Sequence, residues 1–270
     1  MTTDPATEFP APTGVTSGAT ILLVHGAWHG PWCWEDLAER LGDLGNDVRT
    51  VELRGHDGRT GRIWHRIHDY VEDVRDAAAG CRPPLVVVGH SLGGLVAQKV
   101  VESERAAGLV LLAPTPVRGT LPAVGRLALR HPGALLRATL TLRMWPFVRT
   151  HTLVRDLFFT ARTDQWVVHD TWVRLRDESY LAFLQTIVLR PRPGRVRAPV
   201  LVLAAEEDRF FTLAEMERTA HAYGTRAVVV EGSGHDLMLD DGWQDVADGI
   251  DAWIRTAVTA TAGHRGGSAS

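Results

Sequence analysis

Residues 89–94 read Gly-His-Ser-Leu-Gly-Gly, and this stretch decides the fold. The apolar run Leu85–Val88 precedes it with the length of a buried strand, and apolar residues at helical spacing follow it over 92–102. A serine at a sharp strand-to-helix turn presents its hydroxyl outward, but its backbone is strained. Side chains two positions away on either side would collide, which explains the two flanking glycines. The pattern therefore predicts that Ser91 is a nucleophile.

Strand-length apolar runs alternate with helical patterns on both sides of this turn. The expected strands are Thr20–Val24, Asp47–Leu53, Leu85–Val88, Gly108–Ala113, Pro199–Ala204 and Arg226–Glu231. The expected helices are Trp34–Leu44, His68–Ala79, Leu92–Glu102, Leu213–Tyr223 and Trp243–Thr259. Repeated strand–helix units with apolar strands are typical of a mostly parallel sheet with helices on both faces. We therefore expect an α/β fold.

Residues 115–197 interrupt this alternation. They hold 14 arginines and five acidic residues, and they contain no clear strand. Helical patterns recur in them, as in Val124–Arg137 and Trp166–Arg176. We interpret the segment as a helical cap inserted between two strands of the sheet. Its arginines are expected to form a solvated face, with anion binding as the alternative.

The predicted organisation has five parts. A flexible N-terminal tail covers residues 1–18, and a flexible C-terminal tail covers residues 263–270. The α/β core consists of residues 19–114 and 198–262, and the cap of residues 115–197. A chain of 270 residues fits such a core with an inserted subdomain.

The composition is that of an ordinary globular protein, with 45% hydrophobic and 23% charged residues. A net charge of -3 gives no general reason to expect nucleic acid or a membrane as a partner. No apolar run approaches the ~20 residues that span a bilayer, and residues 1–18 lack the pattern of a signal peptide. We expect a cytoplasmic protein with two reduced cysteines, Cys33 and Cys81, and without a metal or cofactor. A homodimer remains open.

A serine hydroxyl is a weak nucleophile and needs a base. His235 follows the expected strand 226–231, and loops at the carboxyl ends of parallel strands carry the site in this architecture. His25 and His90 also lie at strand ends, but inside glycine-rich turns, where a packing or supporting role is expected. His235 is therefore the predicted base.

Three consecutive acids, Glu206, Glu207 and Asp208, follow the expected strand 199–204 and could orient this base. Because residues leaving a strand alternate sides, Glu207 should face away from its two neighbours. Asp208 matches a small-x-x-Asp turn, and its short side chain loses little rotamer freedom when it holds an imidazole. Asp208 is therefore the predicted acid, with Glu206 as the first alternative.

Attack on a carbonyl creates an oxyanion, which needs hydrogen-bond donors. The backbone N–H of Leu92, directly after the nucleophile, is one predicted donor. The turn after the first expected strand, residues 25–28, is expected to supply the other from Ala27. The alternative is that residues 25–28 form a plain glycine turn.

Aromatic residues of the cap indicate an apolar pocket for a hydrophobic small molecule. They include Trp145, Phe147, Phe158, Phe159, Trp166, Trp172 and Phe183. An insertion at the carboxyl ends of the strands can roof over Ser91. We predict substrate contacts from Phe159 and Trp172, together with Trp28 and Phe211 of the core loops. The alternative is that the rings form a small core of the cap itself.

The sequence resembles the α/β-hydrolase superfamily over about residues 19–258. More narrowly, residues 25–34, which read HGAWHGPWCW, are similar to a segment of the plant methylesterase and hydroxynitrile lyase group and its bacterial relatives. Residues 208–211, with Glu215 after them, resemble that group's segment after its catalytic aspartate. The resemblance implies an α/β-hydrolase fold, a catalytic triad and cofactor-free hydrolysis of carboxylic esters, lactones or thioesters. By this resemblance the triad is Ser91, Asp208 and His235, and the oxyanion donors are Ala27 and Leu92.

Two positions depart from the lyases of this group. These carry threonine after the first histidine and lysine after the catalytic histidine, where this chain has Gly26 and Asp236. An aspartate beside the base would oppose the binding of cyanide. Ser91 also excludes, in its usual form, the epoxide-opening and dehalogenating chemistry of relatives with an aspartate nucleophile.

The leading hypothesis is a serine hydrolase for a small or medium hydrophobic carboxylic ester or lactone. A lyase or cyclase that uses the same triad on a biosynthetic intermediate is one alternative. A ligand-binding protein with low turnover is another.

Overall fold

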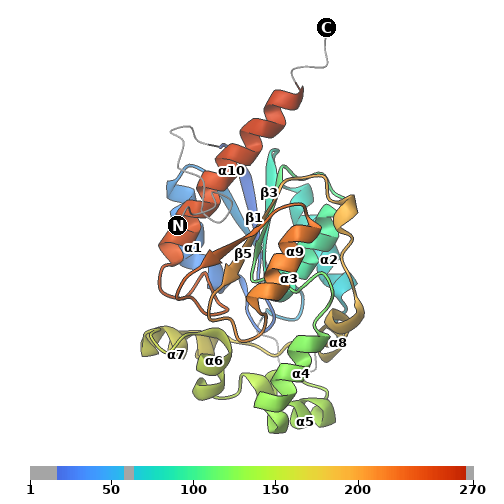
Figure 1. Ribbon diagram of the computed structural model, residues 1–270, viewed down its shortest axis with the longest axis vertical. Coiled ribbons are helices and arrows are strands. Elements are labelled where there is room, and N and C mark those ends of the chain that lie inside the picture. Colours follow the sequence, from blue (N-terminus) through green and yellow to red (C-terminus); the bar gives the residue numbers. More distant parts are fainter. Residues whose placement is uncertain (1–16, 58–63, 266–270) are drawn as a thin grey trace.

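The computed structural model describes residues 17–57 and 64–265, with side chains described up to Ala257. A six-stranded parallel sheet has the strand order β2-β1-β3-β4-β5-β6. Its strands are β1 (Thr20–Val24), β2 (Asp47–Val51), β3 (Leu85–His90), β4 (Gly108–Leu112), β5 (Val200–Ala205) and β6 (Ala227–Val230). The central strands β1, β3, β4 and β5 are almost entirely buried because helices cover both faces (Figure 1). The expected parallel α/β architecture is thereby confirmed.

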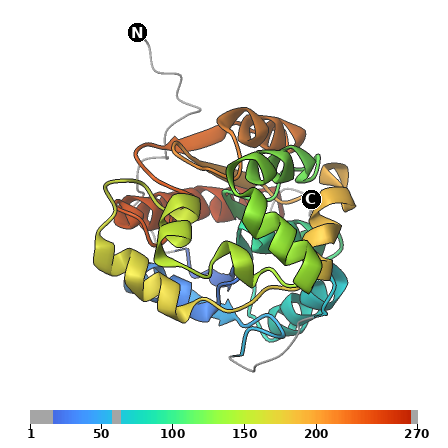
Figure 2. The same cartoon turned by 90° about the horizontal axis from the view of Figure 1, so that it is seen from below.

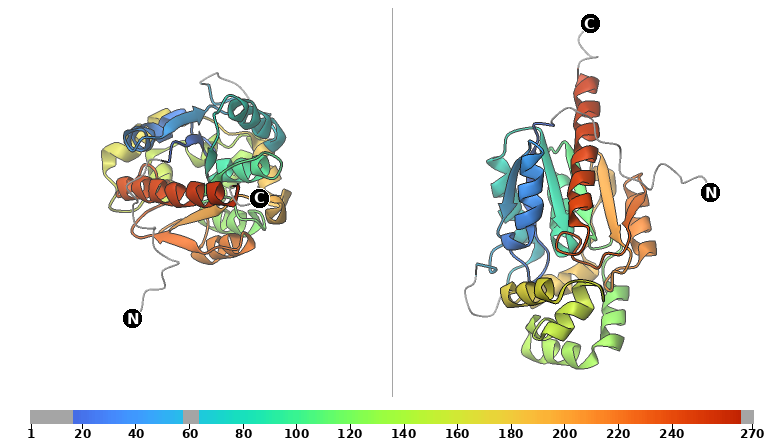
Figure 3. Two further views of the ribbon diagram at one scale, coloured as in Figure 1. Left: turned by 90° about the horizontal axis from the view of Figure 1, so that it is seen from above. Right: turned by 90° about the vertical axis from the view of Figure 1, so that its left-hand side faces the viewer.

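The helices divide between the two faces of the sheet. One face carries α2 (Ile67–Ala79), α3 (Ser91–Val101) and α9 (Leu213–Ala222). The other carries the short helix η2 (Pro31–Trp34), α1 (Glu35–Asp43) and α10 (Trp243–Arg265), as Figure 3 shows. Alternate strand residues supply the two cores: Leu22 and Val24 face one, and Ile21 and Leu23 face the other.

The helical segment, residues 115–197, lies at one end of the sheet (Figures 1 and 2). It contains α4 (Leu121–Arg130), α5 (Pro132–Thr141), η3 (Trp145–Phe147), α6 (His151–Phe158), α7 (Gln165–Arg174), α8 (Tyr180–Val188) and η4 (Pro193–Arg195). The helical pattern over Val124–Arg137 forms parts of two helices, because α4 ends at Arg130 and α5 begins at Pro132. Proline has no backbone N–H and suits the first turn of a helix, so it separates the two.

Buried polar contacts join the helical segment to the core. Glu178 is 2% exposed, and it accepts hydrogen bonds from Tyr70 Oη at 2.6 Å and from His56 Nε2 at 3.2 Å. At the β1–η2 turn, Trp28 donates from Nε1 to the carbonyl of Met144 at 3.2 Å, and its own carbonyl accepts from the N–H of Arg176 at 2.8 Å. These bonds hold the segment over the ends of the strands.

Both predicted tails fall largely outside the described residues. Of the N-terminal tail predicted for 1–18, residues 1–16 lie outside them. Of the C-terminal tail predicted for 263–270, residues 263–265 belong to α10, which continues past the expected end at Thr259, and 266–270 lie outside. Among the helices of the described part of the chain, none is long and apolar enough to cross a bilayer.

Candidate active site

Ser91 occupies the tight turn between β3 and α3. Its φ of +51° lies in the left-handed region, which is costly for a residue with a side chain. A Cβ on Gly89 would lie 2.5 Å from the carbonyl oxygen of Gly93, and a Cβ on Gly93 would collide with the carbonyl oxygens of Val24 and His25. The turn therefore requires both glycines, and it holds the Ser91 hydroxyl at the carboxyl end of the sheet.

His235 lies between Ser91 and Asp208. Its Nε2 is 2.9 Å from Ser91 Oγ, and its Nδ1 is 2.8 Å from Asp208 Oδ2. Because an ionised carboxylate can only accept, Nδ1–H donates to Asp208 and Nε2 is free to accept the Ser91 proton. The side chains of His235 and Asp208 are 2% and 1% exposed, so water does not compete for these bonds. The structure thus brings the three predicted residues into one hydrogen-bonded chain.

The two neighbouring glutamates point elsewhere. Glu206 accepts the N–H of Gly232 at 2.8 Å, and Glu207 pairs with Arg162 at 2.6 Å in an exposed ion pair. Oδ1 of Asp208 accepts the N–H groups of Phe210 and Phe211 at 2.7 and 3.1 Å, which fixes the carboxylate. Of the three candidate acids, Asp208 alone reaches His235.

A buried carboxylate stands beside the histidine. Asp236 is 0% exposed and accepts a hydrogen bond from His29 Nε2 at 3.0 Å. Burial raises the pKa of Asp236, but the neighbouring His29, His90 and His235 lower it further, so the pKa lies below its ordinary value and the group is ionised. Burial lowers the pKa of His235, whereas the Asp208 and Asp236 carboxylates raise it and set the net direction upward.

His90 supports the loop that carries His235. Its Nε2 lies 3.0 Å from the carbonyl oxygen of His235, so Nε2–H donates. Burial holds the pKa of His90 well below its ordinary value, which keeps the ring neutral. The expected supporting role of this histidine is consistent with that contact. The pairing of His29 with Asp236 has no signal in the sequence, because the two residues are far apart in the chain.

Ala27 and Leu92, whose backbone N–H groups are the predicted oxyanion donors, come from different parts of the chain. Ala27 follows β1, Leu92 follows Ser91 at the start of α3, and both residues line one cavity with Ser91. Neither N–H has a hydrogen-bond partner within residues 17–57 and 64–265. Both groups can therefore donate to an oxygen bound beside Ser91.

The cavity at Ser91 is apolar and has room for only a few water molecules, at about 50 Å³. Its lining comprises Ala27, Trp28, Ser91, Leu92, Thr115, Thr120, Ala123, Val124, Leu127, Phe183, Thr186, Phe210 and Phe211. None of these residues is charged, so the cavity favours a neutral, hydrophobic group. Trp28 and Phe211, for which substrate contacts are predicted, belong to this lining, and the contacts stay a prediction.

The other two residues with predicted substrate contacts, Phe159 and Trp172, are not part of this lining. Phe159 belongs to a buried cluster made mostly of residues of the helical segment. Its backbone also contacts Gly234, where a Cβ would lie 2.8 Å from Phe159 Cα. Trp172 packs against His151 and His169, with ring centroids 6.4 and 5.8 Å away. The prediction that Phe159 and Trp172 line the pocket is therefore corrected. Both rings belong to, or pack against, the buried cluster of the helical segment, as the alternative stated.

The residues that replace them come from α4 and α8. Leu127 lies on α4 and is 6% exposed, and Phe183 lies on α8. The sequence signal for Leu127 was the helical spacing of Val124, Leu127 and Ala128, which shows an apolar face but not what that face covers. Thr120 and Thr186 also line the cavity, and their Oγ1 atoms are hydrogen-bonded at 2.8 Å.

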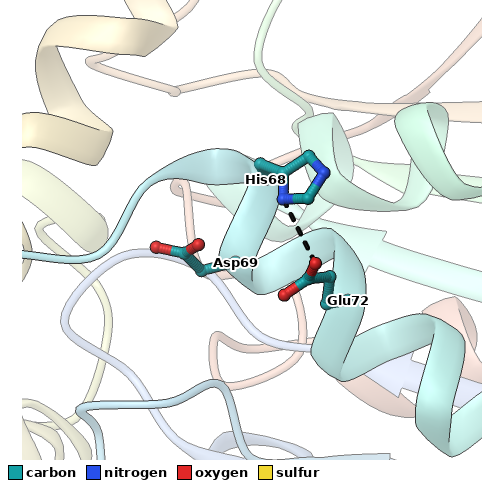
Figure 4. A group of neighbouring side chains, drawn as sticks. All are labelled: His68, Asp69 and Glu72. Carbon is teal, nitrogen blue, oxygen red and sulfur yellow. Dashed lines mark ion pairs between the residues drawn. The ribbon is translucent and has the colours of Figure 1, made fainter.

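One group of metal-type ligands within reach of a single ion occurs in the described residues, namely His68, Asp69 and Glu72 on α2 (Figure 4). The Asp69 carboxylate accepts the N–H of Arg66 at 2.7 Å, which caps the helix. His68 Nδ1 lies 3.5 Å from Glu72 Oε1 one turn later, in an exposed pair. These are the contacts of an ordinary helix start, so we assign no ligand to the group.

A family model described as "Alpha/beta hydrolase family" matches residues 21–249. Among curated proteins, the chain is 32% identical over 110 residues to "Probable esterase PIR7A" of Oryza sativa subsp. indica, which covers 38% of this chain and 41% of that protein. It is 34% identical over 91 residues to the "Carbendazim hydrolyzing esterase" of Nocardioides sp. (strain SG-4G), at 31% of this chain and 36% of that protein. The chain thus spans about two fifths of the length of the curated relatives it matches.

Solved structures match over most of the chain. An extracellular α/β-hydrolase from a Paenibacillus species superposes with a TM-score of 0.67 at 20% identity, over 86% of this chain and 97% of that one. A methylesterase, MES16, from Arabidopsis superposes with a TM-score of 0.67 at 18% identity, over 90% and 99%. At such identities these likenesses show a common fold.

Proposed function

Because the chain belongs to the alpha/beta hydrolase family, we propose that it is a serine hydrolase acting on a small or medium hydrophobic carboxylic ester or lactone. One observation carries the proposal: the chain of hydrogen bonds from Asp208 through His235 to Ser91, which opens into an uncharged cavity. This arrangement is the one that nucleophilic acyl transfer needs.

The first half of the reaction forms an acyl-enzyme. Ser91 Oγ attacks the carbonyl carbon while His235 Nε2 takes its proton, and the Asp208 carboxylate stabilises the resulting imidazolium. The N–H groups of Ala27 and Leu92 hold the oxyanion. The tetrahedral intermediate collapses with cleavage of the C–O bond, and His235 returns its proton to the leaving alkoxide. An alcohol departs, or in a lactone the hydroxyl stays attached to the acyl chain.

The second half releases the acid. A water molecule attacks the acyl carbon, and His235 Nε2 takes its proton as it did from Ser91. Collapse of the second tetrahedral intermediate breaks the bond to Ser91 Oγ, which recovers its proton from His235. The buried Asp236 carboxylate beside this path opposes an anion such as cyanide, which disfavours the lyase alternative.

A fluorophosphonate probe tests the assignment of the nucleophile. The probe should label the wild type on Ser91, as located by peptide mass spectrometry. Ser91→Ala should lose both the label and the turnover of p-nitrophenyl esters, by about 10³- to 10⁶-fold. Ser103→Ala, at an exposed serine, is the matched control and should keep both.

Two outcomes would overturn the proposal. One is wild-type turnover in Ser91→Ala, and the other is an acyl or phosphonyl group trapped on a different residue. A labelled protein without turnover of any ester or lactone in a graded series would favour a ligand-binding protein.

A further inference from the structure

Helices α4 and α5 expose a set of leucines, which we call the leucine face. Leu121 and Leu129 on α4 are 64% and 87% exposed, and Leu136 and Leu140 on α5 are 62% and 75% exposed. The two on α5 are one turn apart, and the two on α4 are two turns apart, so each pair shares one side of its helix. Both helices thus present apolar residues to solvent.

The opposite side of α4 is already occupied. Ala123 and Leu127 are buried, and with Val124 they line the cavity at Ser91. The exposed leucines therefore do not belong to the buried side of α4, which other residues already form. Scattered exposed leucines are normal, whereas a set concentrated on two adjacent helices is the kind of feature that accompanies an interaction surface. Both helices lie at the end of the molecule away from the sheet (Figure 1).

The same stretch has an unusual charge. Residues 115–155 contain seven arginines and no acidic residue, although the whole chain has a net charge of -3. Three of these arginines bind within the protein: Arg126 pairs with Glu215, Arg143 pairs with Asp177, and Arg155 donates to the carbonyl of Thr163. No side-chain hydrogen bond or ion pair is formed within the described part of the chain by the other four, Arg118, Arg130, Arg137 and Arg149.

Two of these unpaired guanidinium groups share a hollow lined partly by α5, the helix that also carries Leu136 and Leu140. The hollow has a volume of about 350 Å³ and is lined by Arg137, Arg149, His131, Gly133, Ala134, Pro146 and Leu153. His131 is held there by the Asp156 carboxylate, 2.7 Å from its Nε2. Two free guanidinium groups over an apolar floor suit a phosphate group that carries hydrocarbon, because guanidinium binds phosphate oxygens in pairs.

From these observations we propose that α4 and α5 dock on a bilayer surface that contains anionic phospholipid. The leucine face enters the boundary between headgroups and acyl chains, and Arg130, Arg137 and Arg149 bind lipid phosphates. A second copy of the chain fits this surface less well, because the same stretch of a partner copy offers no acidic residue to pair with these arginines.

The proposal departs from the sequence expectation of no membrane partner. That expectation used the net charge of the whole chain and the lack of a spanning segment. Neither describes a local surface: the charge of the rest of the chain masks that of residues 115–155, and docking needs no helix that crosses the bilayer.

Sedimentation with vesicles tests this docking, with Ser91→Ala beside the wild type so that binding is measured apart from any turnover. Vesicles of phosphatidylcholine with about 30% phosphatidylglycerol should pellet both proteins at low salt, and vesicles of phosphatidylcholine alone should not. The double variant Arg137→Gln/Arg149→Gln should bind about thirtyfold more weakly, from about fivefold for each basic group. Leu136→Ser/Leu140→Ser should lose at least about tenfold.

Matched controls lie elsewhere on the helical segment. Val188→Ser, at a 71% exposed residue of α8, and Arg197→Gln should bind as the wild type does. Circular dichroism melting checks that each variant folds. If the leucine variant does not fold, the arginine variant still decides.

Three outcomes would overturn the proposal. The first is a wild type that ignores anionic vesicles, and the second is unchanged binding in both double variants. The third is a dimer in size-exclusion chromatography that Leu136→Ser/Leu140→Ser dissociates, since that would assign the leucine face to a second copy.

Discussion

The α/β core and the helical segment use their apolar residues in different ways. In the core, strands such as β1 and β4 are buried along their whole length, and each residue belongs to one of two layers. In the segment, an amphipathic helix such as α4 divides its residues between the cavity and solvent. The segment also carries a net charge of +9, against -12 for the rest of the chain. The core therefore positions Ser91, His235 and Asp208, and the segment supplies part of the lining of the cavity beside Ser91.

The largest expected effect on activity is that of a substitution at Asp208, a residue of the α/β core. Asp208→Asn should keep the fold and lower kcat by about 10⁴-fold, because the amide favours the wrong tautomer of His235. Initial rates with a p-nitrophenyl ester measure the loss, and thermal unfolding measures the fold.

Its neighbours supply the control. Glu206→Gln and Glu207→Gln lie one and two positions away but bond to other groups, so each should cost less than about tenfold. If Asp208→Asn is nearly as fast as the wild type while either glutamine variant is inactive, the acid has been misassigned.

The segment's part in the comparison is tested at Leu127. Leu127→Ala enlarges the cavity, so the ratio of kcat/KM between long and short acyl p-nitrophenyl esters should rise by about 10- to 200-fold. Trp172→Phe changes a ring outside the cavity, and it should alter the free energy of unfolding but leave that ratio unchanged. The opposite result, with selectivity moving in the Trp172 variant alone, would return the pocket to the residues expected from the sequence.

The smallest expected effect concerns pH and the electrostatics around His235. The base must be neutral, so kcat/KM should rise with pH, and because the pKa of His235 is raised the midpoint should lie above the ordinary ~6.5. Asp236 contributes to that increase, so Asp236→Asn should move the midpoint to lower pH while the contacts of His235 with Ser91 and Asp208 remain.

Profiles of kcat/KM, which report on the free enzyme, give both midpoints. A wild-type midpoint below the ordinary value, or an upward shift in Asp236→Asn, would contradict the electrostatic account.

The strands of the core and the turn at Ser91 can be predicted from the sequence, because each depends on residues that are close together in the chain. The strand β3 and the turn at Ser91 follow from an apolar run and two glycines, and the family resemblance is confirmed. The choice among three adjacent acids rested on strand alternation and side-chain length, and in the structure Asp208 is the one that contacts His235. Such features need only the neighbouring residues to be recognised.

The helical segment could not be predicted to the same depth. An apolar stripe shows that a helix has a buried side, but the partner of that side depends on tertiary packing. Phe159 and Trp172 are aromatic, as Phe183 is, but they make other contacts in the structure. Phe159 contacts Gly234, and Trp172 packs against two histidine rings. The break at Pro132 was visible in the sequence, and giving it more weight would have separated α4 from α5.

The small volume of the cavity at Ser91 has a consequence in time rather than in space. Under the proposed function, a substrate larger than this space needs the helical segment to shift before its carbonyl group reaches Ser91. The hydrogen bonds of Trp28 with Met144 and Arg176, and of Glu178 with Tyr70 and His56, would oppose such a shift. The proposed reaction would then have two successive steps, a movement of the segment and acyl transfer, and the slower of the two would set kcat.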